Sequence, residues 1–435
     1  MLPITRLRRW LGRGFAAIFL AWAASAQPIP SALDPIAEAY VRLVLAVGVH
    51  DPDYVDAYHG PAEWRTEAAA ARQPLEAIAR SAGELRTRLA SVRLAMGEPI
   101  IGQRLVFLDR QLAALETRVE LLQGNTLPFD EESQRLYDAV APAYTDEHFA
   151  AIVAELESAI PGTGPLGERL EAFRNQYRIP PERVDAVFQA AIKEARTRTL
   201  RHFPLPADES FTVEYVTDKP WAAYNWYQGS YRSVIQVNVT RPILIDRAID
   251  LACHEGYPGH HVANVLLEQK LYRERGWVEF SVLPLFSPMA LIAEGTGNYG
   301  IKVAFPGDER LAFIRDVLFP LAGLDPTKAD EYDRVDRLTN RLAGAGNEAA
   351  RRFLDGRATA EATADWLVRY ALSQPERAQQ TLSFYRRYRS YVVNYGPGEQ
   401  MVADHVERRA GGDAEKRWAI FGELISSPTV PSDLK

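Results

Sequence analysis

The strongest constraint on the fold is the spacing of apolar residues between about residues 35 and 200. In the segments 75–96 and 102–124, apolar residues recur at steps of three and four, with Glu, Arg and Gln between them. This spacing is typical of amphipathic helices that bury one face. Turn residues at 97–99, 124–125 and 161–165 separate such segments. The sequence therefore predicts a helical bundle for the amino-terminal region, residues 27–200.

The composition changes near His202, where prolines, aromatic residues and β-branched residues replace alanine-rich helix. Within 235–240, apolar and polar residues alternate, which is the period of a strand with one buried face. Helical spacing returns at about Pro242 and continues to about Leu424. We expect a mainly α fold with a small antiparallel sheet inserted in a second region, residues 201–435.

The first 26 residues have the three-part layout of a secretory signal peptide. Arginines come first, an apolar run of about 15–23 follows, and Ala24-Ser25-Ala26 ends the segment. The apolar run is too short to span a bilayer as a stable helix. We expect cleavage after Ala26 and an exported, periplasmic or secreted protein without stable membrane association. An uncleaved anchor is less favoured, because no long stop-transfer run follows.

Net charge and cysteine content exclude some binding partners and an intrachain disulfide. Loss of residues 1–26 removes four arginines and no acidic residue, so the formal net charge changes from −7 to −11. An acidic chain has no electrostatic attraction to nucleic acid or anionic lipid, so we expect neither partner. Cys253 is the only cysteine, which excludes an intrachain disulfide.

The stretch HEGYPGHH, residues 254–261, contains the residue types that bind zinc. In the helical motif H-E-x-x-H, two histidines four residues apart share one face, and the glutamate is directed at the water on the metal. Here His254 and His260 are six residues apart, which on a straight helix turns their rings about 240° from each other. His261 returns to the face of His254, but two turns away, on the order of 10 Å. A regular helix therefore fails for both pairs.

Pro258 and Gly259 offer a solution to this spacing. Proline removes a backbone donor and disturbs the preceding turn, while glycine tolerates unusual dihedral angles. A bulge of two residues would give H-E-x-x-P-G-H and place His260 beside His254. Glu294, on a helix-like stretch forty residues later, completes a set of two histidines and one glutamate. Asn298 follows one turn later and is expected to orient Glu294.

Five stretches together resemble one bacterial family: HEGYPGHH (254–261), EGTGNYG (294–300), DPDYVDAYHGP (51–61), KPWAAYNWYQGSYRSVIQVN (219–238) and YVVNYGPGEQMV (391–402). They are similar to the domain-of-unknown-function family 885, which is grouped with the gluzincin type of zincin metallopeptidases. The resemblance covers most of the chain after residue 26. It implies an α+β zincin-like fold and one zinc ion per chain.

By this resemblance, His254, His260 and Glu294 are zinc ligands and Glu255 is the general base. His261 is either a residue behind the ligands or, if the bulge is three residues long, the ligand itself. Many family members continue the acidic ligand as E-G-W-A-x-Y and carry P-G-Q-A-L-x-Y near the end. This chain has neither pattern, so the group that stabilises the oxyanion is open. Our candidates are Tyr391, then Tyr395, then His405.

The strand of residues 230–240 is expected to hold an extended substrate by edge pairing. In that arrangement Gln236 and Asn238 face the cleft, and Trp221, Tyr224, Trp226 and Tyr227 form its wall. The sequence thus predicts an exported zinc metallopeptidase acting on a peptide or amide substrate. Three alternatives stay open: hydrolysis of a non-peptide amide, a catalytically inactive metal- or peptide-binding protein, and a closed structural zinc site.

Overall fold

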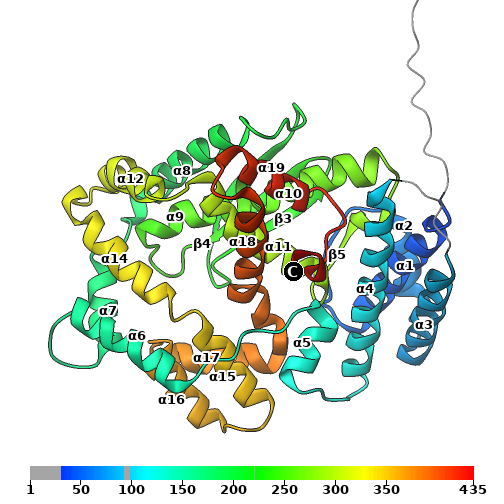
Figure 1. Cartoon of the computed structure of the whole chain (residues 1–435), viewed down its shortest axis with the longest axis horizontal. Coiled ribbons are helices and arrows are strands. Elements are labelled where there is room, and N and C mark those ends of the chain that lie inside the picture. Colours follow the sequence, from blue (N-terminus) through cyan, green and yellow to red (C-terminus); the bar gives the residue numbers. More distant parts are fainter. Residues whose placement is uncertain (1–30, 93–97, 220) are drawn as a thin grey trace, which may run out of the picture.

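The computed structural model describes residues 31–92, 98–219 and 221–435, so the predicted signal peptide lies outside the described residues. The described chain is mainly helical with small sheets, as predicted (Figure 1). None of the described helices has an apolar stretch long enough to cross a membrane.

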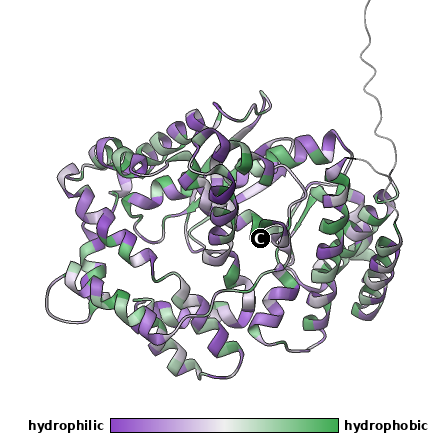
Figure 2. Ribbon diagram, viewed as in Figure 1, coloured by the Kyte–Doolittle hydropathy of each residue, from purple (hydrophilic) through white to green (hydrophobic). Residues whose placement is uncertain are grey.

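The amino-terminal region folds into helices packed side by side. The two segments with the clearest periodicity form α3 and α4, which pack against each other. On α3, Ile78, Ala82, Leu85 and Leu89 are buried at steps of four, three and four, and Figure 2 shows apolar and polar residues alternating along such helices. The helices are α1 (Asp34–His50), α2 (Ala62–Ala71), α3 (Leu75–Ser91), α4 (Pro99–Leu122), α5 (Phe129–Tyr137), α6 (Asp146–Ala159), α7 (Leu166–Asn175) and α8 (Val184–Thr199).

Two small sheets interrupt the helices. β1 (Val55–Tyr58) pairs antiparallel with β5 (Val282–Pro284). The second sheet contains β2 (Ser210–Val216), β3 (Ala223–Gly229) and β4 (Arg232–Asn238) in the order β2-β4-β3. β3 and β4 form an antiparallel hairpin, but β2 runs parallel to β4. The prediction of an antiparallel sheet is therefore wrong for one pair, because β2 is joined to the hairpin by a longer connection and enters from the other side of β4.

The carboxy-terminal region is again helical. Its α-helices are α9 (Ile245–Leu251), α10 (His260–Leu267), α11 (Pro288–Ala304), α12 (Glu309–Phe313), α13 (Phe319–Ala322), α14 (Ala329–Asn340), α15 (Gly344–Leu354), α16 (Ala360–Tyr370), α17 (Pro375–Tyr388), α18 (Gly396–Ala410) and α19 (Ala414–Leu424). Short helices of other types are η1 (Pro181–Arg183), η2 (Ala252–Gly256), η3 (Glu268–Arg273), η4 (Val278–Ser281), η5 (Ile314–Leu318), η6 (Pro326–Lys328), η7 (Arg389–Asn394) and η8 (Pro431–Leu434). Of these, η2, η3 and η5 are π-helices.

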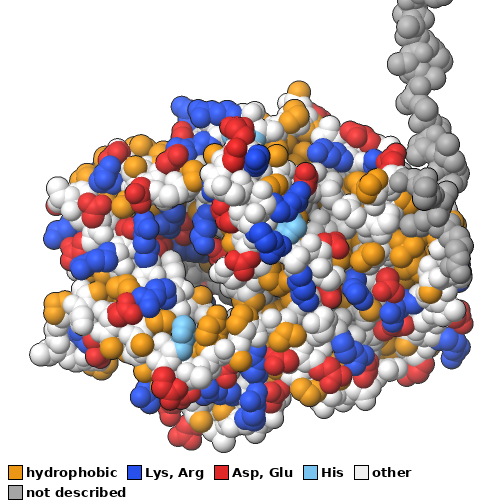
Figure 3. All heavy atoms as spheres, viewed as in Figure 1, with side chains coloured by type: hydrophobic (Ala, Val, Ile, Leu, Met, Phe, Trp, Pro, Cys, Tyr) orange, Lys and Arg blue, Asp and Glu red, His pale blue; other side chains and the backbone are white. Residues whose placement is uncertain are grey.

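Buried apolar side chains form two clusters. The first joins α1, α3, α4, α5, α6 and α7 with α15, α16 and α17. The second joins the β2-β4-β3 sheet with α8, α9, α10, α18 and α19. Helix α11 contributes to both, through Leu291 to the first and Ile292 to the second. In Figure 3 the surface is hollowed near the centre of the view. The division of the chain at residue 200 stays a prediction.

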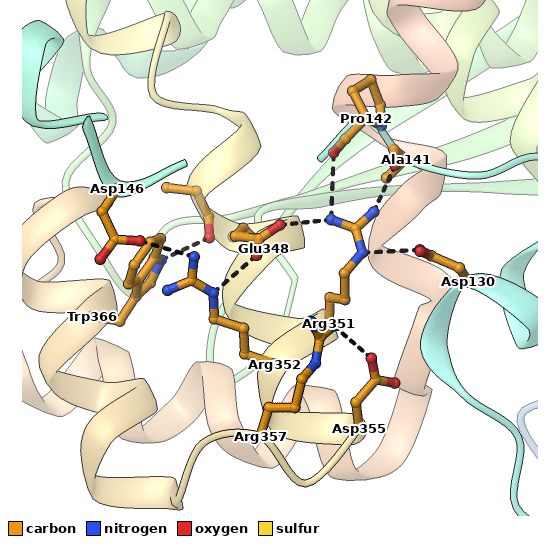
Figure 4. A network of polar contacts seen from close by, with 12 residues as sticks. Asp130, Ala141, Pro142, Asp146, Glu348, Arg351, Arg352, Asp355, Arg357 and Trp366 are labelled. Carbon is orange, nitrogen blue, oxygen red and sulfur yellow. Dashed lines mark hydrogen bonds and ion pairs between the residues drawn. The ribbon is translucent and has the colours of Figure 1, made fainter. Parts of the chain in front are cut away.

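A buried ionic network fastens α15 to the amino-terminal helices (Figure 4). Arg351 donates to Asp130 at 2.9 Å, to Glu348 at 2.6 Å and to the carbonyl oxygen of Ala141 at 2.6 Å. Glu348 also accepts a hydrogen bond from Arg352 at 2.9 Å. Both Arg351 and Glu348 are buried. The network therefore joins α15 to α5 and to the segment that follows α5, which are distant from α15 in the sequence.

Candidate metal centre

The HEGYPGHH motif interrupts a helix in two ways. After α9 the chain widens into the π-helix η2, in which the N–H of Tyr257 bonds to the carbonyl oxygen of Ala252 at 3.1 Å. The next residues leave the helix, the Tyr257–Pro258 peptide is cis, and α10 begins at His260. As a result the rings of His254 and His260 lie face to edge, with their centroids 4.4 Å apart. A π-helix of this kind, which adds a residue to a turn, often occurs at functional sites.

Gly259 is required at the point where the chain turns back. A Cβ atom there would lie 2.0 Å from the carbonyl oxygen of His254 and 2.4 Å from that of Cys253. Its own N–H bonds to the carbonyl oxygen of Cys253 at 2.9 Å. Any side chain at position 259 would push this residue away from the backbone of Cys253 and His254. The close approach of His254 and His260 therefore depends on glycine.

The atoms that could hold a metal lie close together. One ligand-type atom from each of His254, Glu255 and His260 lies within 4.8 Å of the others. Nε2 of His254 lies 3.5 Å from Oε2 of Glu294, and a tetrahedral zinc ion separates its ligand atoms by roughly 3.4 Å. Oε2 of Glu294 is buried, and no described residue hydrogen-bonds to it. Such an oxygen normally has a partner, so this donor set fits a divalent metal ion.

Two carboxylates reach the histidines, and their surroundings differ. Oε1 of Glu294 accepts a hydrogen bond from the Tyr391 hydroxyl at 3.2 Å, which leaves Oε2 directed at His254. The carboxylate of Glu255 accepts no hydrogen bond from the described residues. Its oxygens keep a little contact with solvent, unlike Oε2 of Glu294. The Glu255 carboxylate is therefore free to bond to a water molecule, although the residue is buried, whereas Glu294 is held in place.

Asn298 lies behind His254. Its Oδ1 lies 3.0 Å from Nδ1 of His254, so Nδ1 carries the proton and Nε2 is left free to bind a metal. We expected Asn298 to orient Glu294, and that expectation is wrong. One turn separates the two residues on α11, and the hydrogen bond of Asn298 goes to the histidine.

The protonation equilibria of the site depend on burial and on the neighbouring charges. Burial raises the pKa of Glu255 to about 7, with the negative charge of Glu294 adding to the effect against the opposing charge of His254. Burial lowers the pKa of His260 to about 4, helped by His254. Burial opposes a charge on His254, but contact with Glu294 and the charge of Glu255 raise its pKa overall. The neutral imidazole of His260 is the form that binds a metal ion.

His261 points away from this group. It is fully buried, with Nδ1 at 2.9 Å from Oγ of Ser233 and Nε2 at 2.9 Å from Oε2 of Glu209. Glu209 also accepts hydrogen bonds from Tyr257 at 2.7 Å and from Arg196 at 2.6 Å. Both ring nitrogens of His261 are therefore engaged, and the residue ties the motif to the β2-β4-β3 sheet.

The predicted substrate strand does not have a free edge. β4 is hydrogen-bonded to β2 on one side and to β3 on the other, so edge pairing along 230–240 is wrong. Gln236 bonds to Trp226 and Glu214, and Asn238 bonds to the carbonyl oxygens of Lys219 and Trp221. The Tyr227 hydroxyl is buried and donates to Glu268. The three predicted substrate-binding residues are thus engaged within the protein.

The three candidates for oxyanion stabilisation lie in different places. Tyr391 is buried and bonded to Glu294. Tyr395 packs edge-on against Tyr391 at 5.8 Å, and its side chain is 40% exposed. Although the residue as a whole is exposed, loss of hydration at its hydroxyl, then the charges of Glu294 and Glu255, raise the pKa of Tyr395, so the hydroxyl stays protonated. His405 bonds to the carbonyl oxygen of Leu434 and to Arg409, among the last helices.

Three further residues belong to the site and were not predicted as parts of it. The side chain of Asn225 donates to the carbonyl oxygen of Glu255 at 2.6 Å. Asp56 accepts a hydrogen bond from the Tyr224 hydroxyl, and the charge of Glu294 acts on it. Gly297 faces both rings, since a Cβ atom there would lie 2.9 Å from His254 and 3.2 Å from His260. All three lie in stretches that carried the family resemblance, and only that resemblance could have pointed to them.

Comparison with known proteins supports the fold. No protein-family model and no curated protein matches the chain. A candidate lipoprotein from Colwellia psychrerythraea aligns with a TM-score of 0.54 and 15% identity, over 94% of this chain and 76% of that one. A candidate lipoprotein of unknown function from Shewanella oneidensis aligns with a TM-score of 0.47 and 11% identity, over 92% and 81% of the two chains. M32 carboxypeptidase from Deinococcus radiodurans aligns with a TM-score of 0.45 and 13% identity, over 93% of each chain.

The first of these likenesses shows a shared fold. Because no family model matches, the resemblance to the domain-of-unknown-function family 885 stays a prediction.

Proposed function

We propose that the chain is an exported zinc-dependent hydrolase, and that its most favoured reaction is the cleavage of peptide bonds. The observation that carries this proposal is the buried, unpartnered Oε2 of Glu294 at 3.5 Å from Nε2 of His254, beside the ring of His260. A closed structural zinc site needs a fourth protein ligand. His261, which could have been that ligand, is bonded to Ser233 and Glu209 instead.

His254, His260 and Glu294 would hold the metal, and Asn298 would keep His254 in the tautomer whose Nε2 is free. Zinc supplies a Lewis acid that polarises a carbonyl group and lowers the pKa of water. The open carboxylate of Glu255 accepts the proton of the attacking water and passes it to the leaving amine. Tyr395, whose hydroxyl stays protonated and whose side chain is partly exposed, donates to the oxyanion that forms.

Metal content and turnover together test the proposal. Protein purified after signal cleavage is expected to bind about one zinc per chain. His254→Ala, His260→Ala and Glu294→Ala should lose the metal, while Glu255→Gln should keep it and lose peptide cleavage. His148→Ala, at an exposed histidine on α6, is the matched control and should keep both. Circular dichroism melts identify any variant that has unfolded.

Each outcome separates the alternatives. Zinc bound by the wild type but retained in the three ligand variants would refute the ligand set. Zinc bound with no cleavage of any peptide or amide library would favour the inactive binding protein. An absence of bound metal after reconstitution with zinc would overturn the hydrolase mechanism.

A further inference from the structure

Asp56 has the position expected of a residue that recognises substrate. It lies in β1, where the pairing with β5 shifts register between Val55 and Ala57. A bulge of this kind inserts an extra residue and redirects its side chain, and bulges are frequent beside active sites. The Asp56 carboxylate is directed at β3, where Oδ1 accepts the hydrogen bond of the Tyr224 hydroxyl.

The carboxylate of Asp56 lacks a cationic partner in the described chain. Among the described residues, Tyr224 donates a hydrogen bond to its side chain, and the charge that acts on it is that of Glu294, which is negative. Burial is the main cause that raises the pKa of Asp56 to about 6, which still leaves it largely ionised at neutral pH. Asp56 nevertheless keeps partial exposure. Since buried charges are normally paired, this carboxylate lacks a positive group that the substrate can supply.

The charge balance of the whole site points the same way. Glu255, Glu294 and Asp56 carry three negative charges when ionised, and a divalent ion would neutralise two of them. Arg247, whose charge acts on Glu255, already lies 3.8 Å from a carboxylate oxygen of Asp250. With a divalent ion bound and all three carboxylates ionised, one negative charge stays unbalanced, and it would attract one positive charge of a substrate.

Tyr224, the hydrogen-bond partner of Asp56, belongs to a group of aromatic rings. Tyr224 packs against Trp226 with ring centroids 4.5 Å apart, and against Trp221 at 5.8 Å. Trp226 is 45% exposed. Faces of tryptophan and tyrosine attract cations, and a primary ammonium group beside a carboxylate and aromatic rings is a favourable arrangement.

We propose that the Asp56 carboxylate, oriented by Tyr224 at the edge of this aromatic group, binds an ammonium group of the substrate. This inference rests on the proposed peptidase function. The ammonium can be the free amino terminus of a peptide or the side chain of a lysine residue, since both present the same chemistry. The site would then favour bonds close to a positive charge, with Asp56 determining specificity and taking no part in the chemical step.

The test uses three libraries of tetrapeptide amides. One has free amino termini and no Lys or Arg, the second is its N-acetylated form, and the third is N-acetylated and contains lysine. Wild type, zinc-loaded, should cleave the ammonium-bearing library about 10- to 100-fold faster than the plain acetylated one, the range typical of a hydrogen bond to a charged group. Preference for the first or the third library identifies the source of the ammonium group.

Asp56→Asn should reduce that preference to within about threefold. Asp53→Asn is the matched control, because Asp53 lies three residues earlier and bonds to Arg387 at 2.7 Å on the surface, and it should keep the preference. If Asp56→Asn unfolds, Tyr224→Phe provides the second variant, since it removes only the hydroxyl that orients Asp56 and should weaken the preference in part. Equal cleavage of all three libraries by wild type would overturn the inference while leaving the peptidase function intact.

Binding separates the two proposals if nothing is cleaved. Calorimetric titration of zinc-loaded Glu255→Gln with the same libraries measures affinity without turnover. If wild type cleaves none of the libraries, the peptidase function is refuted. Tighter binding of an ammonium-bearing library that is lost in the Asp56→Asn double variant would then still support the inference. Equal binding of all three libraries, or none, would refute the role of Asp56.

Discussion

Replacing Gly297 by alanine should damage the metal centre without harming the helix that carries it. Gly297 lies inside α11, where alanine is normally more favourable than glycine by about 1 kcal/mol. A Cβ atom at this position would lie 2.9 Å from both Cε1 and Nδ1 of His254 and 3.2 Å from Cε1 of His260. The three atoms nearest to the added methyl group therefore all belong to the two imidazole rings.

The size of the effect follows from these distances. Carbon atoms in contact are about 3.5 Å or more apart, so the His254 ring must retreat by roughly 0.6 Å and the His260 ring by roughly 0.3 Å. Displacements of about 0.5 Å are enough to impair a preorganised site. His254 cannot move alone, because Nδ1 is bonded to Asn298, the residue next to the substitution. We expect zinc affinity to fall about 10- to 100-fold, as when a residue that orients a ligand is lost.

The assay is a zinc titration against a chromophoric chelator, combined with thermal unfolding of the metal-free proteins. Gly102→Ala, near the start of α4, is the matched control because a Cβ atom there meets nothing within 4 Å. Metal-free Gly102→Ala should be as stable as wild type or more stable by about 0.5–1 kcal/mol, and metal-free Gly297→Ala should still fold cooperatively. Only Gly297→Ala should lose zinc affinity. Wild-type affinity in Gly297→Ala would refute the conclusion that both rings face one ion.

Three further predictions concern single polar groups. Glu268 is buried and accepts hydrogen bonds from the backbone N–H groups of the β3–β4 turn at 3.1 and 3.3 Å. Glu268→Gln should therefore lower the free energy of unfolding in urea by about 2 kcal/mol. An unchanged midpoint of urea unfolding would contradict this prediction. Burial and nearby negative charge raise the pKa of Asp336 from 3.8 to about 7. The folded state thus binds this proton more tightly than the unfolded chain, and stability falls as the pH rises from about 4 to about 7. Asp336→Asn should flatten that fall by on the order of 2 kcal/mol, whereas Asp330→Asn, at an exposed position of α14, should leave the pH profile of urea unfolding unchanged. Tyr391→Phe removes the hydrogen bond to Glu294 and should weaken zinc binding about tenfold without loss of folding; equal affinity in the chelator titration would show that Glu294 does not need it.

The sequence predicted the helices well, because burial of one face leaves a regular mark on the chain. The spacing of Ile78, Ala82, Leu85 and Leu89 is visible without a structure, and α3 buries those residues. The break at Pro258 and Gly259 was equally readable, since those two residue types act on the backbone itself. The spacing did not predict the π-helix η2, because a single π-helical turn has no characteristic residue pattern.

Contacts between distant segments were beyond the reach of the sequence. The parallel pairing of β2 with β4 depends on the path of the chain between them, and the sequence of neither strand identifies its partner. His261 looked like a possible ligand because it adjoins His260, and only the position of Glu209, fifty-two residues earlier, shows that its ring is engaged elsewhere. Asp56 was not predicted for the same reason, since its contact with Tyr224 joins residues that are 168 positions apart in the sequence.

The π-helix before the motif limits how the length of this segment can change. His254 and His260 face each other only because the backbone between them holds six steps in the space of a shorter turn. A substitution within this segment acts locally, but removal of one residue would rotate everything after it by about 100° around the helix axis. His261 would then take the position that His260 now has, and His260 would no longer lie opposite His254. Sequence length between 254 and 260 is thus as strictly determined as the identity of the two histidines.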